Sequence, residues 1–329
     1  MPYDRAKAVQ HAHDHWNSPC NDGIFWLSND SVNVEAKRKE LHAPAKDSWV
    51  LRFVPDGKGG EEAVFLRPKH PGGVPIPKLA GTWERKLIQP WEGLADCAHY
   101  LSECLRAGGL TTVNERGVKS LVNTLRARSD TKTLADVVPQ DNAQHVIDSG
   151  IFKPGDMIGY FNISATGDYG GKQDYTHSTM YVGKDPAKNK GRVTCHTKSR
   201  FMDLYNDDEW FLASGDYKYT LIHISADDTP PTKATQDRIE GWWTVEYAGQ
   251  KEFYRFTRQG TVKFTMHQPK TNTSTVQTEI SSGYWFESGS RVIVFWQKWG
   301  VVDLFDLSRV GTKVPFSEDG VTGSATRLF

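Results

Sequence analysis

The chain has 329 residues, which is long for one domain and sufficient for two. Apolar residues make up 38% of it, and with the 29 glycines they reach the range of globular proteins, which excludes disorder for most of the chain. Forty Lys and Arg balance forty Asp and Glu, which does not favour a nucleic-acid partner, and no apolar run approaches the ~20 residues of a membrane span.

The N-terminal region begins with a predicted helix over residues 3–17 and continues into an irregular stretch. Residues 17–90 are rich in turn-forming residues and contain two strand candidates, at 49–54 and 63–67. We interpret 17–90 as an insertion-like elaboration of the first domain. The predicted buried face of the helix, with spacings of three and four, consists of Ala6, Val9, Ala12 and Trp16.

A second helix is predicted over residues 96–107, and it contains the most informative residue of the chain. Asp96 is a good N-cap, which places Cys97 in the first turn of the helix. The N–H groups and the helix dipole at that end favour a thiolate and lower the pKa of the thiol. The alternative for Cys97 is a buried structural cysteine, which is how we interpret Cys104 and Cys20.

Two histidines lie in strand candidates further along the chain. His177 shares one face of its strand with Thr179 and Tyr181, and His196 shares a face with Thr194 in the next strand. If the two strands form an antiparallel hairpin, the histidines can lie near each other, and a helix packed on that sheet can supply the thiol of a nucleophile, base and orienting group. The strand candidates are residues 153–163, 176–183 and 192–198.

The C-terminal part of the chain has a different composition. Residues 227–237 are predicted to be a linker, because they contain two adjacent prolines and no large apolar residue. Beyond them, short strands alternate with turns roughly every 8–12 residues, a rhythm that predicts a small antiparallel barrel or sandwich. We expect a lipocalin-like barrel at 238–329, with its tryptophans in the core, after a first domain at 1–226.

The order of these motifs resembles the NlpC-type, papain-like cysteine hydrolases of bacterial cell-wall metabolism. The matching pieces are DCAHYLSECL around Cys97, KPGD before a strand, and THSTMYVG around His177. The chain is more similar to the bacterial "putative amidase" branch, through YDRAKAVQHAHDHWN, DCAHYLSECLRAGGL and RVTCHTKSR, which together span residues 1–210. The resemblance implies an α+β fold, with a papain-like domain preceding the all-β barrel.

The same resemblance implies a cysteine-dependent amidase or peptidase that hydrolyses an amide bond of peptidoglycan, in the stem peptide or at its link to the glycan. Carried over by position, Cys97 is the nucleophile, His177 the general base and acid, and His196 the orienting residue. Family members vary at the third position. The backbone N–H of Cys97 would donate to the oxyanion.

A metal site is a weaker interpretation of the sequence. His11 and His15 are four positions apart on the first predicted helix and could share an ion. No acidic or cysteine partner follows at a convincing spacing. We therefore expect neither a metal nor a cofactor.

The setting of such an enzyme follows from its substrate. The N-terminal residues lack the apolar stretch of a signal peptide, so we expect synthesis in the cytoplasm. Because peptidoglycan lies outside the cytoplasm, we expect an antibacterial effector toxin that a type VI-like secretion apparatus delivers into the periplasm of a target cell. A cognate immunity protein would then be a further partner. A phage lysis enzyme is another interpretation.

Two alternative functions remain at this point. In the first, the barrel binds a ligand or a partner and the hydrolase domain is degenerate. Cys97 would then react with iodoacetamide no faster than an ordinary thiol at mildly acidic pH. The second is acyl transfer to lipids or proteins, which is disfavoured because relatives with that chemistry tend to have the histidine before the cysteine.

Overall fold

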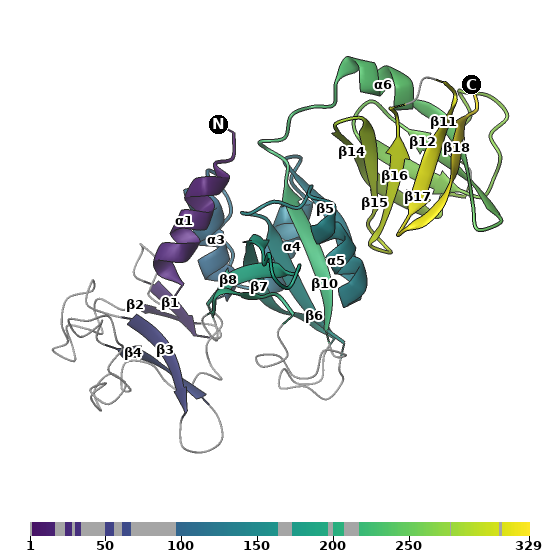
Figure 1. Cartoon of the computed structure of the whole chain (residues 1–329). Helices are drawn as coiled ribbons and strands as arrows, with labels where there is room; N and C mark the ends of the chain where they lie inside the picture. Colours follow the sequence, from purple (N-terminus) through teal and green to yellow (C-terminus); the bar gives the residue numbers. More distant parts are fainter. Residues whose placement is uncertain are drawn as a thin grey trace. The chain divides into compact units, whose positions relative to one another are not determined.

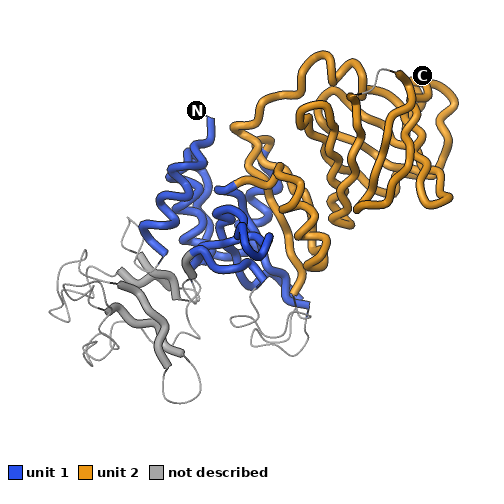
Figure 2. The backbone as a smooth tube through the Cα atoms, viewed as in Figure 1, with its two compact units in different colours: residues 1–128, 154–216 blue, residues 129–153, 217–329 orange. Residues whose placement is uncertain are grey.

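The computed structural model describes residues 2–16, 24–27, 30–33, 50–55, 61–66, 97–163, 173–196, 200–206, 217–276, 278–308 and 311–329. The chain divides into two compact units, which Figure 2 shows in different colours. Unit 1 comprises residues 1–128 and 154–216, and unit 2 comprises residues 129–153 and 217–329. The predicted N-cap Asp96, Cys20 and most of the 17–90 stretch lie outside the described residues.

Unit 1 contains helices and short antiparallel strands, most of which are labelled in Figure 1. Its helices are α1 (Arg5–His15), α3 (Cys97–Ala107) and α4 (Val118–Arg126). Its strands are β1 (Ile24–Leu27), β2 (Asp30–Asn33), β3 (Val50–Pro55), β4 (Glu61–Leu66), β6 (Met157–Asn162), β7 (Asp174–Lys184), β8 (Gly191–Cys195) and β9 (Arg200–Leu204). The two strands predicted within 17–90 are confirmed as the antiparallel pair β3 and β4.

Helix α1 confirms the first predicted helix but buries a partly different face. It begins at the N-cap Asp4, whose side chain accepts a hydrogen bond from a backbone N–H of the first turn. Ala12 of the predicted face is buried and Val9 and Trp16 are half-buried, but Ala6 is exposed and Ala8 is buried in its place, so the predicted face is wrong in part. Small side chains decide the packing: a Cβ on Gly108, just after α3, would come within 3.0 Å of the Ala8 Cβ.

Helix α3 confirms the second predicted helix, and it is buried on most of its sides. It packs against α1 and against strands β7 and β8. The chain leaves the helix through Gly109, whose φ of +111° lies in the region that favours glycine. Cys97 is therefore the first residue of a helix that is held against the sheet.

Unit 2 contains the remaining elements. They are β5 (Thr131–Val138), α5 (Gln140–Asp148), β10 (Tyr217–Ile224), α6 (Lys233–Ile239), β11 (Gly241–Tyr247), β12 (Gln250–Phe256), β13 (Thr261–Thr265), β14 (Ser281–Ser288), β15 (Arg291–Trp296), β16 (Val301–Asp306), β17 (Lys313–Glu318) and β18 (Val321–Arg327). In unit 2, β5 pairs with β10 and strands β11 to β18 form a closed barrel, whereas strands β6 to β9 of unit 1 pair in chain order.

Strand β5 and helix α5 belong to the same compact unit as the barrel. The Asp136 N–H donates a hydrogen bond to the Gln297 carbonyl at 2.8 Å, and His145 Nδ1 lies 3.2 Å from an Asp319 carboxylate oxygen. These contacts join segments that are distant in the sequence. The compact units therefore divide the chain at other positions than the predicted domains 1–226 and 238–329.

The second half of the predicted linker 227–237 lies in helix α6. The hydroxyl of Thr232 accepts a hydrogen bond from the Thr235 N–H at 3.2 Å and caps the helix directly after the two prolines. At the other end of α6, Ile239 packs into the core of the barrel. The helix therefore covers one end of the barrel, as Figure 1 shows.

The barrel prediction is confirmed. Each strand from β11 to β18 is antiparallel to the next, and β18 pairs with β11 to close the ring. Side chains fill the interior, as expected for eight strands. The largest side chains of this core are Trp243, Tyr254, Phe256, Phe264, Trp285, Trp296, Phe305 and Phe316.

Three carboxyl groups lie at one end of the barrel interior, each two residues along its strand from an aromatic residue of the core. Asp303 and Glu318 are directly opposite each other in adjacent strands, where like charges repel. Asp303 is fully buried and accepts a hydrogen bond from Trp296 Nε1 at 2.6 Å, and Tyr254 Oη donates to Glu252 at 3.1 Å. Burial raises the pKa of all three carboxyls, and repulsion from Glu318 adds to the rise for Asp303.

We predict that Asp303→Asn raises the Tm at about pH 8 and leaves it nearly unchanged near the ordinary carboxyl pKa of about 4. A carboxyl with a raised pKa holds its proton more tightly in the folded state than in the unfolded state. The free energy of unfolding therefore falls as the pH rises from the ordinary carboxyl pKa to the raised pKa of the folded state. The amide removes this loss and keeps an oxygen for Trp296. Thermal unfolding followed by tryptophan fluorescence across pH checks this.

The matched control is Glu246→Gln, which neutralises an exposed carboxylate of the same barrel. Its pH dependence should follow that of the wild type. An equally steep fall of Tm with pH in Asp303→Asn and the wild type would contradict the assignment.

Candidate active site

Cys97 occupies the helix position that the sequence predicts. It is the first residue of α3, its side chain is buried, and the first turn contains no acidic residue. No carboxylate of the first turn opposes a thiolate there, and the N–H groups of a helix N-terminus favour one. Cys104 and Cys195 are also buried thiols.

His177 lies in the middle of β7 and is buried. It is directly opposite Tyr160 of β6, and the two ring centroids are 5.4 Å apart at an angle of 52°. Tyr160 is itself fixed, because its hydroxyl donates to the Tyr205 carbonyl at 2.9 Å. The imidazole of His177 therefore packs on an aromatic ring whose orientation is set by a backbone hydrogen bond.

His196 follows β8 directly and contacts two helices. Its ring stacks on Tyr100 of α3, with centroids 4.1 Å apart and planes at 27°. Its Nε2 lies 2.5 Å from the carbonyl oxygen of His15, at the end of α1. Because a carbonyl oxygen only accepts hydrogen bonds, this contact assigns the hydrogen to Nε2 and makes Nδ1 the basic nitrogen of the neutral ring.

Tyr100 connects His196 to the end of α3 that contains Cys97. Tyr100 and Cys97 are three positions apart in α3, and side chains on a helix lean toward its N-terminus. This lean directs the Tyr100 ring toward the turn of Cys97, and the imidazole of His196 stacks on that ring. Tyr100 Oη also donates to the Ala12 carbonyl at 2.7 Å, which ties α3 to α1.

The predicted antiparallel pairing of the two histidine strands is confirmed, but its register separates the two side chains. Met180 pairs with Thr194 and Tyr181 with Val193, and β7 alternates regularly from His177 to Tyr181. Two residues that pair directly across neighbouring strands have their side chains on the same face of the sheet. Met180 and Thr194 therefore share one face, and His177 and Tyr181 share the other. The structure thus brings His196 to the helix of Cys97 through Tyr100, and places His177 against Tyr160.

The other candidates from the sequence are accounted for by packing. His11 and His15 have ring centroids 4.4 Å apart on α1, and burial lowers the pKa of His13 between them. Within the part of the chain that the structure describes, no three His, Cys, Asp or Glu side chains gather in a way that could hold a metal ion. Trp242 is buried, and Trp299 packs against the barrel core.

The sequence interpretation missed the role of Tyr100. Its spacing of three from Cys97 is a usable signal, because residues three apart on a helix are neighbours. The contact of His196 with the backbone carbonyl of His15 could not be predicted from the sequence, since every residue has a backbone carbonyl.

Comparison with protein-family models, with curated proteins and with solved structures gave no match. None of the described helices is long and apolar enough to cross a membrane.

We predict that Tyr100→Phe lowers the free energy of unfolding by about 1 kcal/mol, because the buried hydroxyl of Tyr100 loses its bond to the Ala12 carbonyl while the stacked ring remains. Urea unfolding measures this. The matched control is Tyr175→Phe, whose hydroxyl accepts an exposed hydrogen bond from Arg126, and it should change stability by about 0.5 kcal/mol or less. Equal effects of the two substitutions would show that Tyr100 does not hold α3 to α1.

Proposed function

We propose that this chain is a cysteine-dependent amide hydrolase with Cys97 as its nucleophile. One observation carries the proposal: Cys97 begins a buried helix, and an imidazole with an assigned tautomer, His196, is stacked on Tyr100 of that same helix. A helix N-terminus stabilises a thiolate, and a nearby imidazole can accept the thiol proton. These are the two requirements of a cysteine nucleophile.

The reaction would proceed through a thioester. Cys97 Sγ attacks the carbonyl carbon of the amide, and the backbone N–H of Cys97 donates to the resulting oxyanion. The imidazolium gives its proton to the leaving nitrogen, and the C–N bond breaks to release an amine. Water, activated by the same imidazole, then hydrolyses the thioester and restores the thiol.

The general base is one of the two histidines of the β7–β8 hairpin. The resemblance to NlpC-type hydrolases assigns the base to His177 and the orienting role to His196. The contacts support His196 as a base as well, because its Nε2–H is held by the His15 carbonyl and its Nδ1 is the basic nitrogen. Substitution of each histidine separates the two assignments.

The substrate class rests on the resemblance alone. It points to an amide bond of peptidoglycan, in the stem peptide or at its link to the glycan. Because peptidoglycan lies outside the cytoplasm, the proposal includes action in the periplasm of a target cell, with delivery by a dedicated secretion system.

Digestion of purified sacculi, with released fragments identified by mass spectrometry, tests the proposal. We expect the wild type to release defined fragments and Cys97→Ala to lose about a thousandfold or more of the rate. The masses of the fragments identify the scissile bond. Cys104→Ala is the matched control, because it removes a buried thiol from the same helix away from its N-terminus, and it should retain the wild-type products.

The histidine variants assign the base in the same assay. Removal of the base should cost about as much as removal of the nucleophile, and removal of the orienting residue about a hundredfold less. Equal activity of the wild type and Cys97→Ala would contradict the proposal. No release by either protein would favour the alternative, in which the barrel unit binds a ligand and the hydrolase site is degenerate.

A further inference from the structure

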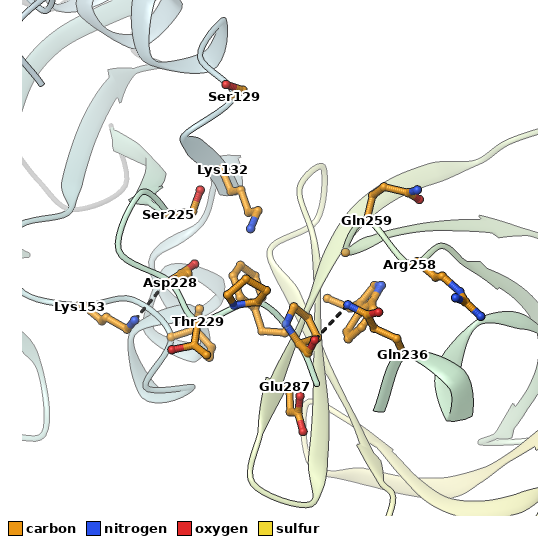
Figure 3. A pocket seen from close by; sticks show the side chains of 16 residues that line it. Ser129, Lys132, Lys153, Ser225, Asp228, Thr229, Gln236, Arg258, Gln259 and Glu287 are labelled. Atoms are coloured by element: carbon orange, nitrogen blue, oxygen red, sulfur yellow. Dashed lines mark hydrogen bonds and ion pairs between the residues drawn. The ribbon is translucent and has the colours of Figure 1, made fainter. Parts of the chain in front are cut away.

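Unit 2 contains a cavity of about 550 Å³, a size within the range of small-molecule sites. It lies among the beginning of β5, the loop that follows β10, the turn between β12 and β13, and strand β14. Figure 3 shows these segments around the open space, with the Lys132 side chain directed into it. The lining combines several charged side chains with apolar groups from β14 and the proline-containing loop.

Nearly every charged group of this lining has an ionic or hydrogen-bond partner. Asp228 lies 3.0 Å from Lys153 Nζ and 2.9 Å from His223 Nε2. Burial alone would raise the pKa of Asp228, but hydrogen bonding and charge from His223 and Lys153 hold it well below its ordinary value. Glu287 accepts hydrogen bonds from hydroxyls at the start of α6, at 2.6 and 3.0 Å. Arg258 lies within 3.0 Å of two carboxylates at the end of that helix.

Lys132 differs from these charged residues in its neighbours. Its ammonium lies 4.8 Å from the centroid of the Phe286 ring, and among the described residues no carboxylate lies within ion-pair distance of it. Burial lowers the pKa of Lys132, the negative charge of Asp228 offsets part of this fall, and the positive charge of Lys153 adds to it. A half-buried cation over an aromatic face is well placed to pair with an anion, because both groups are already partly desolvated.

The surroundings of Lys132 restrict the kind of anion. Asp228 lines the same cavity and its charge acts on Lys132, so its negative charge favours a singly charged carboxylate over a phosphate dianion. Phe286, Pro230 and Ile151 supply apolar surface for the body of a ligand, and the exposed amide of Gln259 lies at the rim.

We propose that this cavity binds a small N-acyl amino acid or the C-terminal residue of a peptide. Lys132 pairs with the carboxylate, and Phe286 packs against the apolar part of the ligand. The residues that carry this proposal belong to unit 2, whereas Cys97 belongs to unit 1, so the site is a binding site in addition to the proposed hydrolase site.

Isothermal titration with hippurate, which combines a carboxylate, an amide and an aromatic ring, tests the proposal on the full-length protein. Neutral hippuramide and phenyl phosphate serve as comparison ligands. We expect hippurate to bind the wild type, and Lys132→Met to weaken it about tenfold or more, which corresponds to about 1.4 kcal/mol. Lys132→Arg keeps the charge and should stay within about threefold of the wild type. Lys251→Met, which removes an exposed lysine, should bind as the wild type does.

A second measurement, the NMR titration of Lys132, is made on the wild-type protein. In protein labelled with ¹³C at lysine Cε, the titration midpoint of Lys132 should move upward when hippurate is added, because the carboxylate stabilises the ammonium. Lys132→Arg identifies the signal by its loss.

Equal binding of hippuramide and hippurate, tighter binding of phenyl phosphate, undiminished binding to Lys132→Met, or no saturable binding of hippurate would each overturn the proposal. Cys97→Ala should bind hippurate as the wild type does, so this test is independent of the hydrolase activity.

Discussion

The side chain of Tyr100 is the contact on which the rest of unit 1 depends. Its hydroxyl holds the Ala12 carbonyl of α1, and its ring supports the imidazole of His196 at the end of β8. The same residue lies one helical turn from Cys97. Helix α1, helix α3 and the end of the hairpin thus meet on one buried aromatic ring.

Two ionisable groups of unit 2, Asp303 and Lys132, are partly or fully removed from water. Asp303 lies inside the barrel beside other carboxyls, and burial raises its pKa, which costs stability as the pH rises. Lys132 lies at the edge of a cavity with a ring face as its neighbour. Natural cores avoid such groups unless they are paired or used. The two residues differ in access, because Asp303 is enclosed by packed aromatic side chains whereas Lys132 lines an open cavity.

Periodicity and turn chemistry predicted several elements of this chain, because they depend on local sequence, whereas α4, β5, α5, β10 and α6 were not predicted. The helix of Cys97 and the strands of the barrel are examples. The burial of Ala8 in α1 was not predictable, since it depends on the close fit of Ala8 against Gly108, which follows helix α3. The site was partly predictable: the strand of His177 and the antiparallel pairing followed from the pattern. The register that separates His177 from Thr194 did not, because one residue of slip exchanges the two faces of a strand.

The pH dependence of Cys97 alkylation by iodoacetamide, followed by peptide mapping, tests the central claim most directly. The midpoint of the profile reports ionisation of the thiol even where burial slows access. The account predicts a midpoint at least about one unit below the ordinary thiol value of about 8.5, and a shift toward that value in whichever variant, His196→Ala or His177→Ala, removes the base. Cys104 in the same protein is the internal control. A Cys97 profile with an ordinary midpoint that neither histidine variant changes would contradict the account.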